Sequence, residues 1–156
     1  MERNQNSIAI LKNLIEINSN RTIIYQKVSE ECKSLDIDLH WIFNTMANES
    51  RRYVSELTRE AVKMGGEPVI DPMSKGKIYQ VWMDVTATFS GCDRQSILES
   101  CEFVEDTIQR EYNKAIAGGA ELDARIIMII VNQKAYLKTT HKLVKNYRDA
   151  YFKMIY

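Results

Sequence analysis

The chain is poor in the residues that interrupt helices. Its 156 residues include only 6 glycines and 2 prolines, which fall at 65–76, at 91 and at 118–119. A chain made of strands needs a turn roughly every 8 to 12 residues. The long segments without glycine or proline therefore exclude an all-β fold and predict a protein made mostly of long helices.

The chain also lacks a charge excess and long apolar segments. Its 21 basic and 21 acidic residues cancel, which argues against binding nucleic acid or an anionic membrane through bulk charge. The longest apolar run, Ile126–Val131, is far shorter than the roughly 20 residues that span a bilayer. The polar start Met1–Ser7 does not resemble a signal peptide, and the three cysteines lack metal-type spacing. We therefore expect a cytoplasmic protein with reduced thiols and neither a nucleic-acid nor a membrane partner.

Apolar residues recur at helical spacing along most of the chain. They predict four long helices and one short one, at about 4–32, 36–64, 94–117 and 120–152, with the short helix at 77–89.

Short turns join the first two and the last two long helices, so each pair should form an antiparallel hairpin. The link at 65–93 is long enough to return along the length of a bundle. We therefore predict a single all-α domain over residues 1–156, a four-helix bundle with one long crossover that carries the short helix. In this topology the second and third long helices run parallel.

A polar residue interrupts the apolar stripe of each long helix near its middle. The four residues are Asn18, Glu49, Glu105 and Gln133. In an antiparallel hairpin, residues at the same height have numbers symmetric about the turn. The first two are symmetric about Lys33–Ser34 and the last two about Gly119, so each hairpin should bring its polar pair to one level.

Further polar side chains lie beside this predicted layer. Arg52 and Glu102 are one turn from Glu49 and Glu105, and Tyr136 follows Gln133. A buried charge is costly unless it is paired or bound to metal. The layer is therefore either a metal site, or the remnant of one, or a hydrogen-bonded layer that fixes the helix register. A third interpretation is that some of the glutamates point to solvent.

Several stretches of the sequence are similar to one protein family. They are LIEINSNRTIIY, FNTMANESRRYVSEL, VKMGGEP, VWMDVTATFSGCDRQSILESCEFVED and LKTTHKLVKNYRDAY. Together they resemble a bacterial family of small ferritin-like proteins of unknown function over residues 8–151, most specifically between Trp82 and Asp106. The resemblance implies a ferritin-like fold and no particular activity.

Ferritin-like di-iron proteins take one glutamate from each of two helices and Glu-x-x-His from each of the other two. Matched to that pattern, this chain keeps the carboxylates of Glu49 and Glu105. The remaining positions hold Asn18, Arg52, Gln133 and Tyr136. An arginine stays charged and cannot ligate a metal, so Arg52 is expected to neutralise Glu49 together with Glu102 or Glu105.

We therefore predict a non-catalytic ferritin-like protein with a binding or structural role, a degenerate metal site and no cofactor. The alternative is a divergent protein that handles iron, another divalent metal or oxidants through Glu49, Glu102 and Glu105, with Gln133 and Asn18. His40 and His141 are interpreted as separate surface histidines. The aromatic segment 147–156 suits an interface, which makes a homodimer the one partner that the sequence suggests.

Overall fold

The computed structural model describes residues 2–31, 37–67 and 94–155, which form four long α-helices. They are α1 (Glu2–Glu31), α2 (Ile37–Lys63), α4 (Arg94–Ala117) and α5 (Ala124–Ile155). The all-α prediction is confirmed, whereas the short helix predicted at 77–89 lies outside the described residues. Helix α5 begins later than predicted because Leu122 N–H bonds to the carbonyl of Gly119, and the helical hydrogen bonds start at Asp123.

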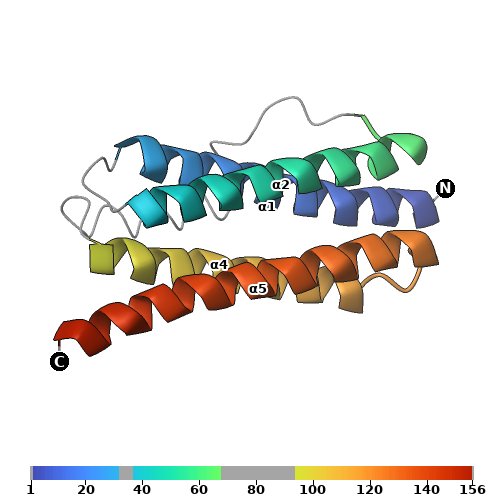
Figure 1. The fold of residues 1–156 in the computed structure, drawn as a ribbon. Coiled ribbons are helices and arrows are strands. Elements are labelled where there is room, and N and C mark those ends of the chain that lie inside the picture. The colour runs from blue at the N-terminus through green and yellow to red at the C-terminus, as the bar shows by residue number, and fades with distance from the viewer. Residues whose placement is uncertain (1, 32–36, 68–93, 156) are drawn as a thin grey trace.

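The helices form two antiparallel hairpins that pack side by side (Figure 1). Helix α1 pairs with α2 and α4 with α5, while α1 also packs on α4 and α2 on α5. Figure 1 shows α2 and α4 running in the same direction, so α2 ends at the opposite end of the bundle from the start of α4. The predicted parallel arrangement of these two helices is confirmed.

A glycine pair ends α2. Gly65 has a φ of +91°, a left-handed conformation that costs glycine little because it has no Cβ. The turn lets Gly66 N–H bond to the carbonyl of Ala61 at 2.9 Å, which satisfies a carbonyl that the end of the helix would otherwise leave unpaired.

The core runs the length of the bundle and is mostly apolar. Leu14, Ile24, Phe43 and Leu57 are among its fully buried side chains. Near the middle, a layer of polar side chains replaces this apolar packing, and one of its members is the fully buried Arg21. Among the described residues, no helix has the length and apolar character needed to cross a membrane.

Candidate functional site

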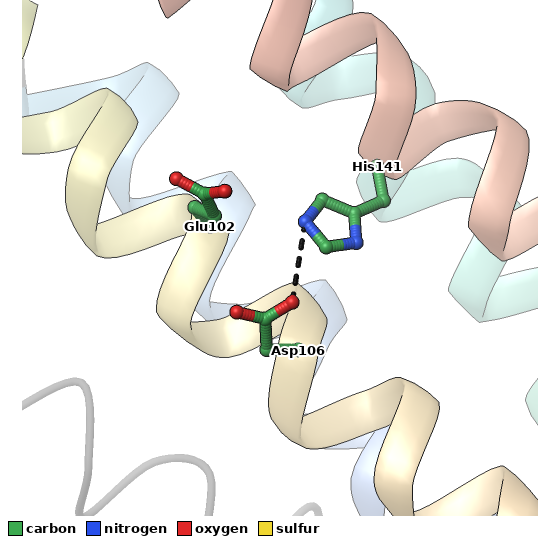
Figure 2. Close-up of side chains that lie close together, drawn as sticks. All are labelled: Glu102, Asp106 and His141. Atoms are coloured by element: carbon green, nitrogen blue, oxygen red, sulfur yellow. Dashed lines mark ion pairs between the residues drawn. The ribbon is translucent and has the colours of Figure 1, made fainter.

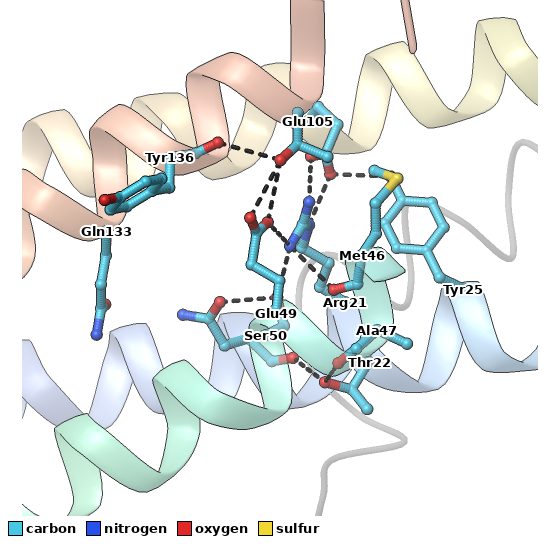
Figure 3. Close-up of polar contacts among 12 residues, drawn as sticks. Arg21, Thr22, Tyr25, Met46, Ala47, Glu49, Ser50, Glu105, Gln133 and Tyr136 are labelled. Atoms are coloured by element: carbon cyan, nitrogen blue, oxygen red, sulfur yellow. Dashed lines mark hydrogen bonds and ion pairs between the residues drawn. The ribbon is translucent and has the colours of Figure 1, made fainter. Parts of the chain in front are cut away.

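The centre of the bundle is organised around one buried arginine, Arg21 on α1 (Figure 3). Its Nε and Nη2 donate to the two carboxylate oxygens of Glu105 at 3.0 and 2.8 Å. Its Nη1 donates to Glu49 Oε1 and Ser50 Oγ, both at 2.8 Å, and to the carbonyl of Met46 at 3.2 Å. One guanidinium therefore joins carboxylates from α2 and α4.

Both carboxylates receive a further donor. The hydroxyl of Tyr25 donates to Glu105 Oε2 at 2.8 Å, and that of Thr140 donates to Glu49 Oε2 at 3.1 Å. Burial by itself would lower the pKa of Arg21, but the charges of Glu105 and Glu49 outweigh it and raise that pKa above its usual value. Arg21 therefore stays charged, and the pairing offsets the several kcal/mol that desolvation of each ion costs.

A chain of hydrogen bonds extends the layer away from Arg21. Ser50 Oγ donates to Asn18 Oδ1 at 2.9 Å, and Asn18 Nδ2 donates to the hydroxyl of Tyr112 at 2.8 Å. That hydroxyl donates to Gln133 Oε1 at 2.7 Å, and Gln133 Nε2 donates to Glu56 Oε2 at 3.0 Å. The chain includes residues from all four helices, so it fixes their heights relative to one another.

The tyrosines of the layer stay protonated. Burial, followed by the charge of Glu105, raises the pKa of Tyr25 well above 10. Burial also raises the pKa of Tyr112, and burial with the charge of Glu49 raises the pKa of Tyr53 to about 12. The hydroxyls of Tyr25 and Tyr112 can therefore serve as hydrogen-bond donors at any physiological pH.

The structure brings together four of the residues predicted for the layer. Asn18, Glu105 and Gln133 are buried, and Glu49 is mostly buried at the edge of its helix stripe. Glu102 is not among them, because it lies near the surface and pairs with Arg148 on α5. Of the two candidate carboxylates on α4, Glu105 is therefore the inward one.

The prediction that Arg52 is the central cation is wrong. Its side chain is 64% exposed and lies 4.0 Å from Glu56 on its own helix. Tyr136, predicted beside the layer, is likewise 62% exposed. Each follows its polar neighbour by three residues and lies on the solvent side of its helix stripe. At the four-residue spacing, Tyr53 and Leu137 are buried instead.

Sequence reasoning missed Arg21 as the cation. The signal was its position, because it lies three residues after Asn18 and four before Tyr25 on the buried stripe of α1. The two glutamates that match ferritin-type ligand positions, Glu49 and Glu105, both bind this guanidinium. The central residues therefore do not fit a metal ion as they are arranged.

A hollow of about 610 Å³ opens between α2 and α5. Three arginines, Arg52, Arg59 and Arg125, line it together with Glu56 and Glu60. Arg125 pairs with Glu60, and Arg52 approaches Glu56. Within the described part of the chain, Arg59 forms no ion pair, so the hollow has one cation more than its own carboxylates neutralise.

A second polar cluster lies on the outer side of the α4–α5 hairpin (Figure 2). It consists of Glu102 and Asp106 on α4 and His141 on α5. His141, interpreted from the sequence as a separate surface histidine, has Nε2 3.5 Å from Asp106 Oδ1. His40 has a different partner, since its Nδ1 lies 3.3 Å from Ser29 Oγ.

Residues 6–118, which include most of α1 and all of α2 and α4, match the protein family described as Domain of unknown function (DUF2383). The chain belongs to this family. The sequence predicted membership of a family of unknown function, and this match confirms it. No curated protein matches the DUF2383 chain significantly.

Solved structures with a similar fold include Dps of Mycobacterium smegmatis. Its tetragonal form superimposes on the DUF2383 chain with a TM-score of 0.80 at 14% identity, over 94% of this chain and 88% of that one. An N-terminal deletion mutant of the same Dps gives 0.78 at 13% identity, over 94% and 97%. At these identities the likeness establishes the fold alone, and it agrees with the predicted ferritin-like bundle.

Proposed function

We propose that this DUF2383 protein is a non-catalytic ferritin-like bundle with a binding or structural role, and that Arg21 closes its centre to metal ions. The observation that supports this proposal is the fully buried guanidinium, which binds both oxygens of Glu105 and one oxygen of Glu49. Those two residues supply the carboxylates that match the ferritin pattern. The guanidinium of Arg21 therefore binds the carboxylates that a metal ion would need as ligands.

The electrostatic cost of adding a metal is large. A divalent ion about 5 Å from a guanidinium is repelled by roughly 6–7 kcal/mol at an effective dielectric constant of about 20. Arg21 cannot escape this repulsion by losing its proton, because the neighbouring carboxylates raise its pKa. The alternative function, a divergent metal-handling protein that uses Glu49 and Glu105, therefore requires Arg21 to leave the core.

Metal titration tests the proposal. We would titrate Mn(II), Zn(II) and, without oxygen, Fe(II) into a His141→Ala variant, in which the outer cluster of α4 and α5 has lost its imidazole. No tight binding is expected, because Arg21 still neutralises Glu49 and Glu105. Adding Arg21→Ser should create binding and metal-dependent stabilisation, since a ligand that binds only the folded form stabilises it. Tight binding by the His141→Ala variant alone would overturn the proposal in favour of the metal-handling alternative.

A small anionic ligand is the second candidate, for the hollow between α2 and α5. Arg59, which forms no ion pair with another described residue, and the adjacent Arg52 and Arg125 favour a carboxylate or phosphate group there. Inorganic phosphate and citrate should raise the melting temperature of the parent protein, and Arg59→Gln should remove most of that rise. Arg51→Gln is the matched control, because Arg51 is exposed on the same helix and bonds to Asn48 outside the hollow. An equal loss in both variants would mean that the anion effect is non-specific.

A further inference from the structure

The outer cluster of α4 and α5 has the geometry of a metal site. Glu102 and Asp106 are four residues apart on α4 and so project from the same face. His141 faces them from α5 (Figure 2), and one ligand atom of each residue lies within 4.8 Å of the other two. Two donors bound to one tetrahedral ion at about 2.0–2.1 Å lie roughly 3.4 Å apart. The Nε2 of His141 and Oδ1 of Asp106 are 3.5 Å apart, so this pair needs almost no movement.

The histidine is the least exposed member of the cluster. Its side chain is only 16% exposed, and among the described residues the buried Nε2 has no hydrogen-bond partner. Native proteins leave few buried polar atoms without a partner, and a bound ion can satisfy such an atom in place of a hydrogen bond. In the tautomer that carries its proton on Nδ1, Nε2 presents a lone pair to the two carboxylates, and a cation between them would bind all three groups.

Cations also lie beside the cluster. Arg148 on α5 pairs with Glu102 and also donates to Asp149 Oδ1 at 3.1 Å. Lys138 and Lys145 are one helical turn on either side of His141, so the two carboxylates of the cluster itself supply the negative charge for a metal ion. Arg148 competes with a metal for Glu102, but Asp149 remains its partner when a metal binds that carboxylate.

We propose that Glu102, Asp106 and His141 form a binding site for a single divalent transition-metal ion of the zinc type. One imidazole nitrogen and two carboxylate oxygens are ligands of this class, and they leave a coordination position open. Magnesium and calcium prefer sites made entirely of oxygen atoms. The site is on the outer side of the α4–α5 hairpin, whereas Arg21 is inside the bundle, and the proposal is independent of the closed centre.

Calorimetric titration of zinc chloride into the full chain tests the site, together with the visible absorption of added Co(II). The parent protein should bind one ion. His141→Ala and Asp106→Asn should each weaken binding by about tenfold or more, in line with the cost of disturbing metal-site residues. Both positions are near the surface, so the variants should fold, which circular dichroism checks.

Two control variants change a residue of the same type outside the proposed site. His40→Ala removes the other histidine, and Glu99→Gln removes an exposed glutamate on α4 whose partner is Gln95; neither should change the affinity. Arg148→Gln should tighten binding severalfold, because it removes the guanidinium that competes with the ion for Glu102. Zinc binding that survives His141→Ala unchanged, binding lost in His40→Ala, or no binding by the parent would each overturn the proposal.

Discussion

Replacing Arg21 with methionine tests the organisation of the bundle centre. The change keeps a long flexible side chain but removes five hydrogen bonds and the one buried cation of the layer. Glu105, which is 1% exposed, then faces Glu49 without a neutralising partner. Breaking one side of a buried ion pair costs about 3–5 kcal/mol, a large part of the roughly 5–15 kcal/mol that stabilises a typical domain.

Urea unfolding followed by circular dichroism measures this loss. With a slope of about 2 kcal/mol per molar urea, a loss of about 4 kcal/mol lowers the midpoint by about 2 M. Arg52→Met is the matched control, because Arg52 is exposed and its one ion pair is at 4.0 Å. Exposed pairs contribute about 0–1 kcal/mol, so its midpoint should shift by less than about 0.5 M.

A double variant separates the lost charge balance from lost packing. In the Arg21→Met background, Glu105→Gln removes the carboxylate that was left unpaired. It should recover part of the lost stability, since replacing a whole buried ion pair with neutral groups is often close to neutral. If Arg21→Met costs no more than Arg52→Met, the placement of the central cation is wrong. If Glu105→Gln gives no recovery, the loss comes from packing.

Three further predictions concern the same core. Burial raises the pKa of Tyr25 and Tyr112 above 10, the pH at which they ionise when unfolded. Their contribution to the free energy of unfolding should be fully present below pH 10 and fall by about 1.4 kcal/mol per pH unit for each tyrosine above it. Equal urea midpoints at pH 9 and pH 11 would contradict this. Asn20 is 1% exposed and, in the described part of the chain, its amide has no hydrogen-bond partner. Asn20→Leu should therefore raise the free energy of unfolding by about 1–3 kcal/mol, and a lower melting temperature would be the opposite result. Gln133→Leu removes the acceptor of the Tyr112 hydroxyl and should cost about 1–3 kcal/mol in urea unfolding, whereas an unchanged midpoint would mean that the bond contributes nothing.

Helical spacing was enough to predict the four long helices, and the two short turns with the long link at 65–93 predicted the parallel run of α2 and α4. It also placed Asn18, Glu105 and Gln133 on the inner faces, because a residue's position within an apolar stripe determines which way it points. The same spacing is a poor guide at the edge of a stripe. Arg52 and Tyr136 are predicted beside the layer but are mostly exposed, whereas Arg21, at the same three-residue spacing from Asn18, is fully buried.

The role of Arg21 could not be read from local sequence. Arginine is almost never fully buried unless it is paired, so its residue type argued against the interior. Its partners are 28 residues away at Glu49 and 84 residues away at Glu105. Only the packing of α1 against both α2 and α4 brings these groups together, and no short window of the sequence contains that information.

The buried guanidinium of Arg21 provides the positive charge at the centre of the fold. Proteins whose core is completed by a bound metal fold only as far as that metal is available, and chelators can unfold them. Here the positive charge between Glu49 and Glu105 is synthesised with the chain. It is present in a ratio of one to one with the two glutamates. The proposed function therefore implies that the centre of this bundle is completed by folding alone and that chelators leave its stability unchanged.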